Sequence, residues 1–131
     1  MDQKLGVSPE SRPRVLLADD HAGILAALRR LLSPSCEIVG SVMDGVALIE
    51  AASRLEPDVI VADVAMPELD GIAAGQRIKQ AMPQVKIIFL TASSDTDVKE
   101  KALSVGASAF VEKRAMADKL PKAIQEALSE E

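Results

Sequence analysis

Residues 59–71, VIVADVAMPELDG, run from four apolar residues into Asp63 and then into a segment of turn-forming residues. The apolar run predicts a short strand with both faces buried, as in a parallel sheet. Pro67 fixes the backbone φ after this strand, whereas Gly71 is expected to supply conformational freedom where the next helix begins. Asp63 therefore allows two interpretations: a polar residue that meets solvent at a strand end, or a carboxylate held there for chemistry.

Strand-like and helix-like segments alternate on both sides of this stretch. The expected strands cover residues 15–18, 36–42, 59–62, 85–90 and 107–111. The expected helices cover residues 21–32, 46–55, 71–82, 95–105 and 115–128, with Gly106 as a C-cap. Regular alternation predicts an α/β fold with a parallel sheet and helices on both faces. We expect the flavodoxin-like (βα)5 three-layer sandwich, with a five-stranded sheet in the order 2-1-3-4-5.

Apolar spacing predicts which side of a helix faces the core. In the helix over 46–55, Val46, Ile49 and Leu55 are expected to lie on one side. Cys36 is the single cysteine, so it cannot form a disulfide within the chain, and we expect it to be a small strand residue.

The composition limits the classes of protein. The 131 residues suggest one domain, expected over residues 14–131 after a flexible arm at residues 1–13. The net charge of −5 disfavours direct binding of nucleic acid, and aromatic residues make up only 2% of the chain. No apolar segment is long enough to span a membrane, and the N-terminus does not resemble a signal peptide. We therefore expect a cytoplasmic protein with no membrane partner.

Polar residues stand at the carboxyl ends of four of the five expected strands. Asp19 and Asp20 follow the first strand, Asp63 ends the third, Thr91 follows the fourth, and Lys113 comes two residues after the fifth. In doubly wound sheets, ligands bind beyond the carboxyl ends of the strands, where the strand order reverses. We therefore expect three carboxylates, one hydroxyl and one lysine to converge on one edge of the sheet.

These groups suit phosphoryl transfer. Clustered carboxylates repel each other, and a Mg²⁺ or Mn²⁺ ion with oxygen ligands would relieve the repulsion. A carboxylate can act as a nucleophile toward phosphorus and form an aspartyl phosphate. A cation and a lysine would neutralise charge on the transferred group, which is most of what such a reaction requires.

Four segments, in this order, resemble the receiver domain of bacterial two-component response regulators. They are LLADDH (16–21), VIVADVAMPELDG (59–71), FLTA (89–92) and GASAFVEK (106–113). The resemblance covers about residues 14–128. It is strongest for receivers of the nitrate-response type, which often carry a C-terminal helix-turn-helix; this chain contains no such segment, so the resemblance does not imply that output.

The resemblance implies a role for each acidic position. Asp63 matches the aspartate that takes a phosphoryl group from a histidine kinase or a phosphotransfer protein. Asp19, Asp20 and Asp63 match the carboxylates that bind Mg²⁺ or Mn²⁺, and the backbone carbonyl of Ala65 matches a further ligand. Because the Ala65 side chain cannot position an attacking water, the lifetime of the phosphoryl group stays open.

The resemblance also implies roles on the other side of the site. Thr91 matches the hydroxyl that moves to the phosphoryl group, and Lys113 matches the lysine that pairs with it. Phe110 matches the aromatic switch residue, although it has no hydroxyl to donate. Many receivers have a cis-proline after the lysine; here Arg114 stands in that place, and no cis bond is expected. His21 is interpreted as lying near the site without being required.

The leading hypothesis is a phosphorylatable signalling switch rather than an enzyme. Phosphorylation of Asp63 would shift the face formed by residues 95–105, 107–111 and 115–128, which a partner, an output domain or a second copy would read. The first alternative is an unphosphorylated pseudo-receiver that acts as a protein-interaction module. An aspartate-nucleophile phosphatase is disfavoured because Ala65 stands where a second aspartate would be needed. A flavin carrier is disfavoured by the absence of Trp and Tyr.

Overall fold

The computed structural model describes residues 12–93 and 95–129, so the expected flexible arm lies outside the described residues except for residues 12–13. Each expected strand and helix is present, with ends that differ by one or two residues. The strands are β2 (Arg14–Ala18), β3 (Glu37–Val42), β4 (Val59–Asp63), β5 (Lys86–Thr91) and β6 (Ala109–Glu112). The helices are α1 (Ala22–Leu32), α2 (Gly45–Leu55), α3 (Gly71–Ala81), α4 (Thr96–Ser104) and α5 (Met116–Ser129), and the 3-10 turn η2 (Lys113–Ala115) precedes α5.

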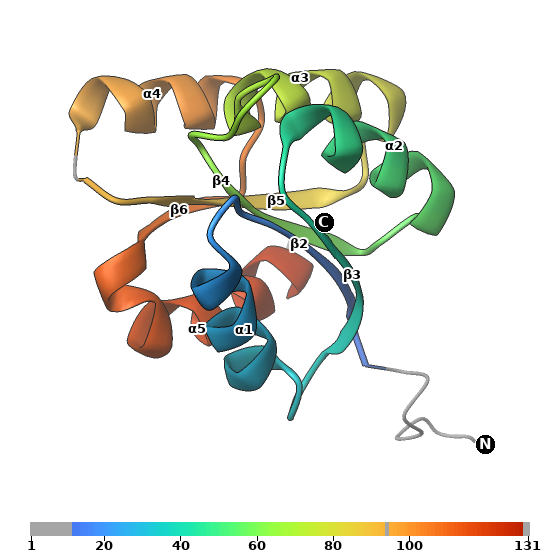
Figure 1. The fold of residues 1–131 in the computed structure, drawn as a ribbon, viewed down its shortest axis with the longest axis vertical. Coiled ribbons are helices and arrows are strands. Elements are labelled where there is room, and N and C mark those ends of the chain that lie inside the picture. The colour runs from blue at the N-terminus through green and yellow to red at the C-terminus, as the bar shows by residue number, and fades with distance from the viewer. Residues whose placement is uncertain (1–11, 94, 130–131) are drawn as a thin grey trace.

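The strands form one parallel sheet in the order β3-β2-β4-β5-β6, which confirms the predicted order 2-1-3-4-5. Helices α2, α3 and α4 cover one face, and α1 and α5 cover the other (Figure 1). The strand order reverses between β2 and β4. The next strand after β2, β3, lies on one side of it, whereas β4, β5 and β6 follow one another on its other side. All carboxyl ends of the strands therefore meet at one edge, and the reversal point lies there between β2 and β4.

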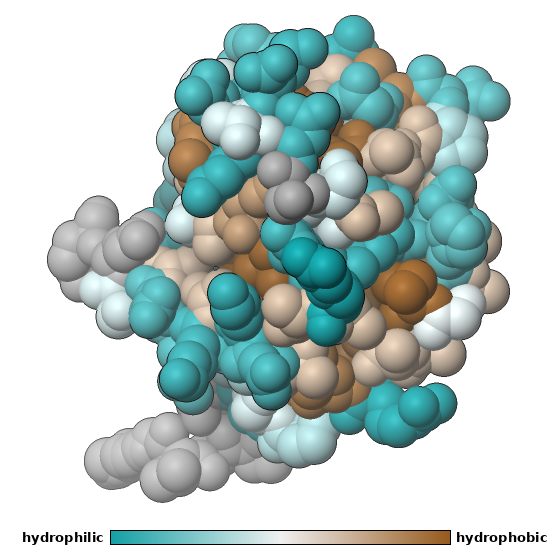
Figure 2. Space-filling view, turned by 90° about the vertical axis from the view of Figure 1, so that its left-hand side faces the viewer, coloured by the Kyte–Doolittle hydropathy of each residue, from teal (hydrophilic) through white to brown (hydrophobic). Residues whose placement is uncertain are grey.

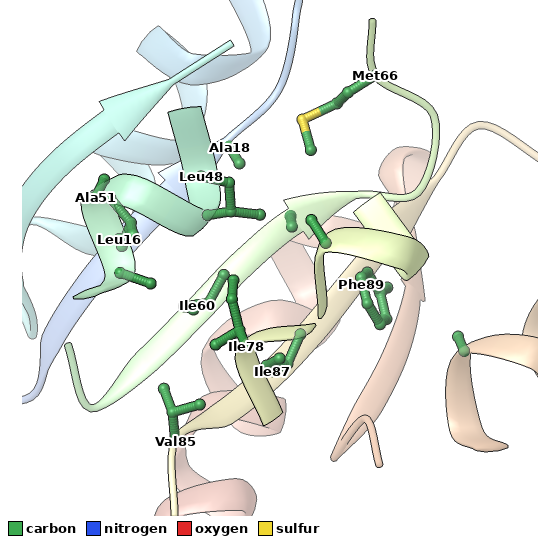
Figure 3. Close-up of a cluster of buried hydrophobic side chains, with 14 residues drawn as sticks. Leu16, Ala18, Leu48, Ala51, Ile60, Met66, Ile78, Val85, Ile87 and Phe89 are labelled. Atoms are coloured by element: carbon green, nitrogen blue, oxygen red, sulfur yellow. The ribbon is translucent and has the colours of Figure 1, made fainter. Parts of the chain in front are cut away.

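The central strands divide their side chains between two hydrophobic clusters. In β4, Ile60 points to the cluster under α2, α3 and α4, whereas Val59 and Val61 point to the cluster under α1 and α5. All three side chains are fully buried. Figure 3 shows the first cluster, in which Leu48 of α2 and Ile78 of α3 lie over the sheet. Because β4 is packed on both faces, it is a rigid support for the residue at its end.

The prediction that Val46 shares one side of α2 with Ile49 and Leu55 is wrong, because Val46 is 57% exposed while the other two pack against the cluster under α2, α3 and α4. The buried residues of this helix are Gly45, Leu48, Ala51 and Ala52. The cause is helix geometry: at about 100° per residue, Val46 and Leu55 point to opposite sides of the helix. Val46 therefore faces away from the cluster, whereas Gly45 packs so closely that a Cβ atom there would overlap the backbone carbonyl of Leu69.

Asp70 and Gly106 lie at helix ends with typical capping geometry. Asp70 caps α3, because its carboxylate accepts a hydrogen bond of 2.8 Å from the Ala73 amide. Gly106 follows α4 with a φ of 94°, the left-handed conformation that favours glycine after a helix. No peptide bond of the described residues is cis, as expected for the bond after Lys113. None of the described helices is long and apolar enough to cross a membrane.

Cys36 should react slowly with thiol reagents. Its residue surface is 4% exposed, and burial raises the pKa of its thiol, so the reactive thiolate is disfavoured. We expect Ellman's reagent to label the native protein at least about 100-fold more slowly than the urea-unfolded protein, because labelling requires local opening. The release of the coloured thiolate measures both rates. Equal rates in the two states would contradict the buried position.

Candidate functional site

Three polar side chains are buried at the carboxyl ends of neighbouring strands. Asp19 follows β2 and is fully buried, Asp63 ends β4 and is 5% exposed, and Thr91 ends β5 and is 3% exposed. They are the buried polar or charged residues among those the structure describes. Because β2, β4 and β5 are adjacent and parallel, these residues lie on one edge. Burying carboxylates is costly unless they are paired, so their partners show what the site can do.

Lys113 joins two of the carboxylates. Its Nζ lies 2.8 Å from Asp19 Oδ2 and 2.9 Å from Asp63 Oδ2, and its side chain is only 15% exposed. Burial lowers the pKa of Lys113, but the short contacts with two negative charges outweigh burial and raise the pKa above the ordinary lysine value. The ammonium therefore keeps its charge at neutral pH and serves as the cation shared by the two carboxylates.

Asp19 has an acceptor atom that is not fully used. Its Oδ1 accepts a hydrogen bond of 2.9 Å from the His21 amide. Its Oδ2 is buried and lies 2.8 Å from the Lys113 ammonium. A carboxylate oxygen has two lone pairs, so this one contact leaves Oδ2 able to accept a further interaction.

A divalent cation fits this edge. The side chain of Asp20, 37% exposed, lies beside the buried Asp19 and offers carboxylate oxygens that water and ions can reach. Carboxylate oxygens are the ligands that Mg²⁺ and Mn²⁺ prefer, and Mg²⁺ retains several waters, so few protein ligands are needed. The underused oxygen of Asp19 supports the same conclusion, since a cation would complete its interactions.

The loop after β4 holds the Asp63 carboxylate in one orientation. Asp63 Oδ1 accepts a hydrogen bond of 3.1 Å from the Ala65 amide, and the Gly71 amide donates to the Val64 carbonyl at 2.9 Å. Gly71 does not supply the expected conformational freedom, because its φ is not in the left-handed region. It is needed for space instead: a Cβ atom there would overlap the Asp63 carbonyl oxygen. The sequence offered no signal for this contact beyond the glycine itself.

Thr91 and Phe110 lie on neighbouring strands beside the carboxylates. The Thr91 hydroxyl oxygen accepts a hydrogen bond of 3.2 Å from the Ser93 amide, and Thr91 pairs with Glu112 in the sheet register. Phe110 is partly buried and packs against the cluster under α2, α3 and α4. It also lines a hollow of about 410 Å³ between α4, β6 and α5. Thr91 thus lies at the edge with the carboxylates, whereas Phe110 lies deeper along β6.

His21 lies closer to the acidic pair than the sequence suggested. Its Nδ1 is 3.4 Å from Asp20 Oδ1 and 3.6 Å from Asp19 Oδ1. Within the described residues, Asp19, Asp20 and His21 form the group with possible ligand atoms all within 4.8 Å of one another. Asp63 is not in that group, since its oxygens face Lys113 and the Ala65 amide. The sequence signal for this proximity is that His21 directly follows the two aspartates.

Comparison with known proteins gives a consistent result. The model of the response regulator receiver domain matches residues 15–125. The transcriptional regulatory protein LiaR of Bacillus subtilis (strain 168) is 35% identical over 116 residues, which are 87% of this chain and 55% of LiaR. The transcriptional regulatory protein DegU of Brevibacillus brevis is 30% identical over 118 residues, which are 88% of this chain and 50% of DegU. The chain thus spans about half the length of these relatives.

Solved structures show the same architecture. The signal receiver domain of the putative response regulator NarL from Mycobacterium tuberculosis aligns with a TM-score of 0.85 and 27% identity, covering 91% of this chain and 98% of that one. The response regulator domain of Thermotoga maritima CheB aligns with a TM-score of 0.85 and 29% identity, covering 92% of this chain and 98% of that one. Both are similar along nearly their whole length.

Proposed function

This chain belongs to the family of response regulator receiver domains of two-component signalling, and we propose that it acts as a phosphorylatable switch with Asp63 as the phosphoacceptor. The observation that carries the proposal is the Lys113 ammonium shared between Asp63 and Asp19 at a buried strand edge. A carboxylate placed only to meet solvent would be exposed and would not need a buried cation. The relatives are transcriptional regulatory proteins, which supports a switch rather than an enzyme with a small-molecule product.

The residues of the edge divide the reaction between them. One oxygen of the Asp63 carboxylate attacks the phosphorus of the donor, a phosphohistidine of a kinase or a phosphotransfer protein. The O–P bond forms as the P–N bond breaks, and the released imidazole takes up a proton. The nucleophile is aligned before the reaction, because the Ala65 amide and the Lys113 ammonium already hold one carboxylate oxygen each.

The other residues of the edge stabilise the transferred group. Asp19 and Asp20, with Asp63 and the Ala65 carbonyl, would hold Mg²⁺ or Mn²⁺, which neutralises charge on the carboxylates and the phosphoryl oxygens. The Lys113 ammonium pairs with a phosphoryl oxygen. The Thr91 hydroxyl exchanges its contact with the Ser93 amide for a phosphoryl oxygen, to which it donates.

The output of the switch is read on the side formed by α4, β6 and α5. Thr91 ends β5, and Phe110 of the adjacent β6 lines the hollow between α4 and α5, so movement of Thr91 would change the space beside Phe110. Figure 2 shows the molecule from this side, where apolar residues form several separate patches among polar ones. We propose that a partner, a second copy or an output domain in a longer chain binds there. The relatives, of which this chain covers about half, support the last of these.

An alternative is a pseudo-receiver that binds partners without phosphorylation. Such a domain has no need of the acidic pair, the hydroxyl and the lysine together, and the structure describes all of them at one edge. An aspartate-nucleophile phosphatase requires an acid two residues after the nucleophile, where this chain has Ala65. Both alternatives are therefore less favoured than the switch.

The switch is tested by phosphorylation with a small-molecule donor. The protein is incubated with acetyl phosphate and Mg²⁺, and the intact mass is measured. We expect one added phosphoryl group, and we expect none in the Asp63→Asn variant or when EDTA removes the cation. The control is Asp97→Asn, which removes an exposed carboxylate from the first turn of α4 and should be labelled as the wild type is. An unlabelled wild type, or equal labelling of Asp63→Asn, would refute the proposal.

A further inference from the structure

We propose that His21 is a metal ligand at the acidic edge, and that its imidazole gives the site a preference for transition-metal ions such as Ni²⁺ and Zn²⁺ over Mg²⁺. This inference rests on the proposed function, because Asp19 and Asp20 are also among the proposed ligands of Mg²⁺ or Mn²⁺. It adds a nitrogen donor to a set of ligands that otherwise consists of oxygens. The observation behind it is the position of the His21 Nδ1 atom beside the Asp19 and Asp20 carboxylates.

The distances are close to those between ligands of one ion. Neighbouring ligands of an octahedral ion with bonds of about 2.1 Å lie about 3 Å apart. His21 Nδ1 lies 3.4 Å from Asp20 Oδ1 and 3.6 Å from Asp19 Oδ1, and possible ligand atoms of the three residues all lie within 4.8 Å of one another. Both distances are about 0.5 Å longer than the spacing in an octahedral site. The carboxylate of Asp19 also accepts a bond from the His21 amide, which ties the acidic pair and the imidazole to one loop.

The backbone of His21 is fixed, and its ring is accessible. The His21 carbonyl accepts a hydrogen bond of 3.1 Å from the Leu25 amide at the start of α1, and its own amide is bound by Asp19. The side chain is 72% exposed, and no capping bond from it is present at the helix start. An ion can therefore reach the ring from solvent without displacing a capping hydrogen bond of α1.

The nitrogen donor changes which ions bind well. Imidazole is a preferred ligand of Zn²⁺, Cu²⁺, iron and Ni²⁺, whereas Mg²⁺ prefers oxygen ligands and retains its waters. Nickel is a useful comparison with magnesium, because both readily take octahedral coordination. A mixed set of two carboxylates and one imidazole would bind Ni²⁺ more tightly and leave Mg²⁺ binding to the oxygens. A bound transition metal would then compete with Mg²⁺ for Asp19 and Asp20.

Calorimetry with each metal alone tests the inference. Protein without a histidine tag is titrated with Ni²⁺ and separately with Mg²⁺ at about pH 8, where imidazoles are generally neutral. We expect His21→Ala to weaken Ni²⁺ binding at least about tenfold and to change Mg²⁺ binding by less than about twofold. The comparison variant, Asp20→Asn, should weaken the binding of both ions. Equal effects of His21→Ala on both ions, or no effect on Ni²⁺, would overturn the inference.

Nuclear magnetic resonance gives a second readout. The chain has a single histidine, so imidazole signals of the untagged protein belong to His21. We expect stoichiometric Zn²⁺ to shift these signals, and Zn²⁺ added to Asp20→Asn to shift them much less. Unshifted signals in the wild type would show that any Zn²⁺ binds elsewhere and would overturn the inference.

The outcome separates this inference from the proposed function. If the wild type takes up a phosphoryl group with Mg²⁺ but His21→Ala leaves Ni²⁺ affinity unchanged, the switch stands and the nitrogen ligand is refuted. If the wild type takes up no phosphoryl group but His21→Ala selectively weakens Ni²⁺ binding, the metal site stands and the switch is refuted.

Discussion

Replacing Lys113 by methionine should lower the free energy of unfolding by about 3 kcal/mol when no divalent cation is present. The Lys113 ammonium lies between Asp19 and Asp63, whose side chains are 0% and 7% exposed. Methionine keeps most of the apolar stem but leaves two buried carboxylates without a cation. Their mutual repulsion and lost solvation then oppose folding, which makes this a large effect for one side chain at the edge of the sheet.

Urea unfolding in EDTA and in Mg²⁺ measures this effect. We expect Mg²⁺ to stabilise Lys113→Met more than the wild type, because a cation replaces the lost ammonium and no longer competes with it for Asp19. Lys122→Met is the matched control, since Lys122 is exposed on α5, and we expect a change within about 0.5 kcal/mol. If Lys113→Met in EDTA is as stable as the wild type, the ion pairs do not support the fold in the way that their geometry indicates.

The fold could be predicted from the sequence because one pattern is repeated. Strands such as residues 59–62 are apolar on both faces, which is uncommon outside parallel sheets. Once the alternation of strands and helices is recognised, the rule of right-handed crossovers leaves few strand orders. The same reasoning predicted that Asp19, Asp63 and Thr91 would meet, because each stands where a strand ends. Neither step depends on side-chain detail.

The contacts that could not be predicted depend on packing between distant segments. The approach of Gly45 to the Leu69 backbone, 24 residues later in the chain, is one such contact. The exposure of Val46 is a different case, because about 100° per residue places Val46 opposite Leu55, so helix periodicity itself predicts the outward position. The sequence also could not show that Lys113 contacts both Asp19 and Asp63, since this depends on the conformation of a long side chain.

Gly71→Ala should lower the free energy of unfolding by about 2 kcal/mol and slow phosphoryl uptake about 100-fold. A Cβ atom at this position would overlap the carbonyl oxygen of Asp63 and would lie 3.1 Å from the Val64 Cα. These are backbone atoms, so the clash cannot be relieved by rotating a side chain. The end of β4 must move instead, and it carries the proposed nucleophile. A displacement of about 1 Å is enough to disturb alignment with the phosphorus.

The matched control is Gly23→Ala in α1, where nothing lies within 4 Å of the added Cβ atom. Alanine favours helices over glycine by about 1 kcal/mol, so this control should be neutral or stabilising. The same preference acts at Gly71, the first residue of α3, and would offset part of the clash. The two variants therefore differ mainly in what the methyl group meets.

Urea unfolding and the rate of mass increase with acetyl phosphate measure both effects. If Gly71→Ala matches Gly23→Ala in stability and in rate, the contact between Gly71 and Asp63 does not position the carboxylate. If Gly71→Ala loses stability but keeps the wild-type rate, the contact supports the fold alone, and the alignment of Asp63 depends on the Ala65 amide and the Lys113 ammonium.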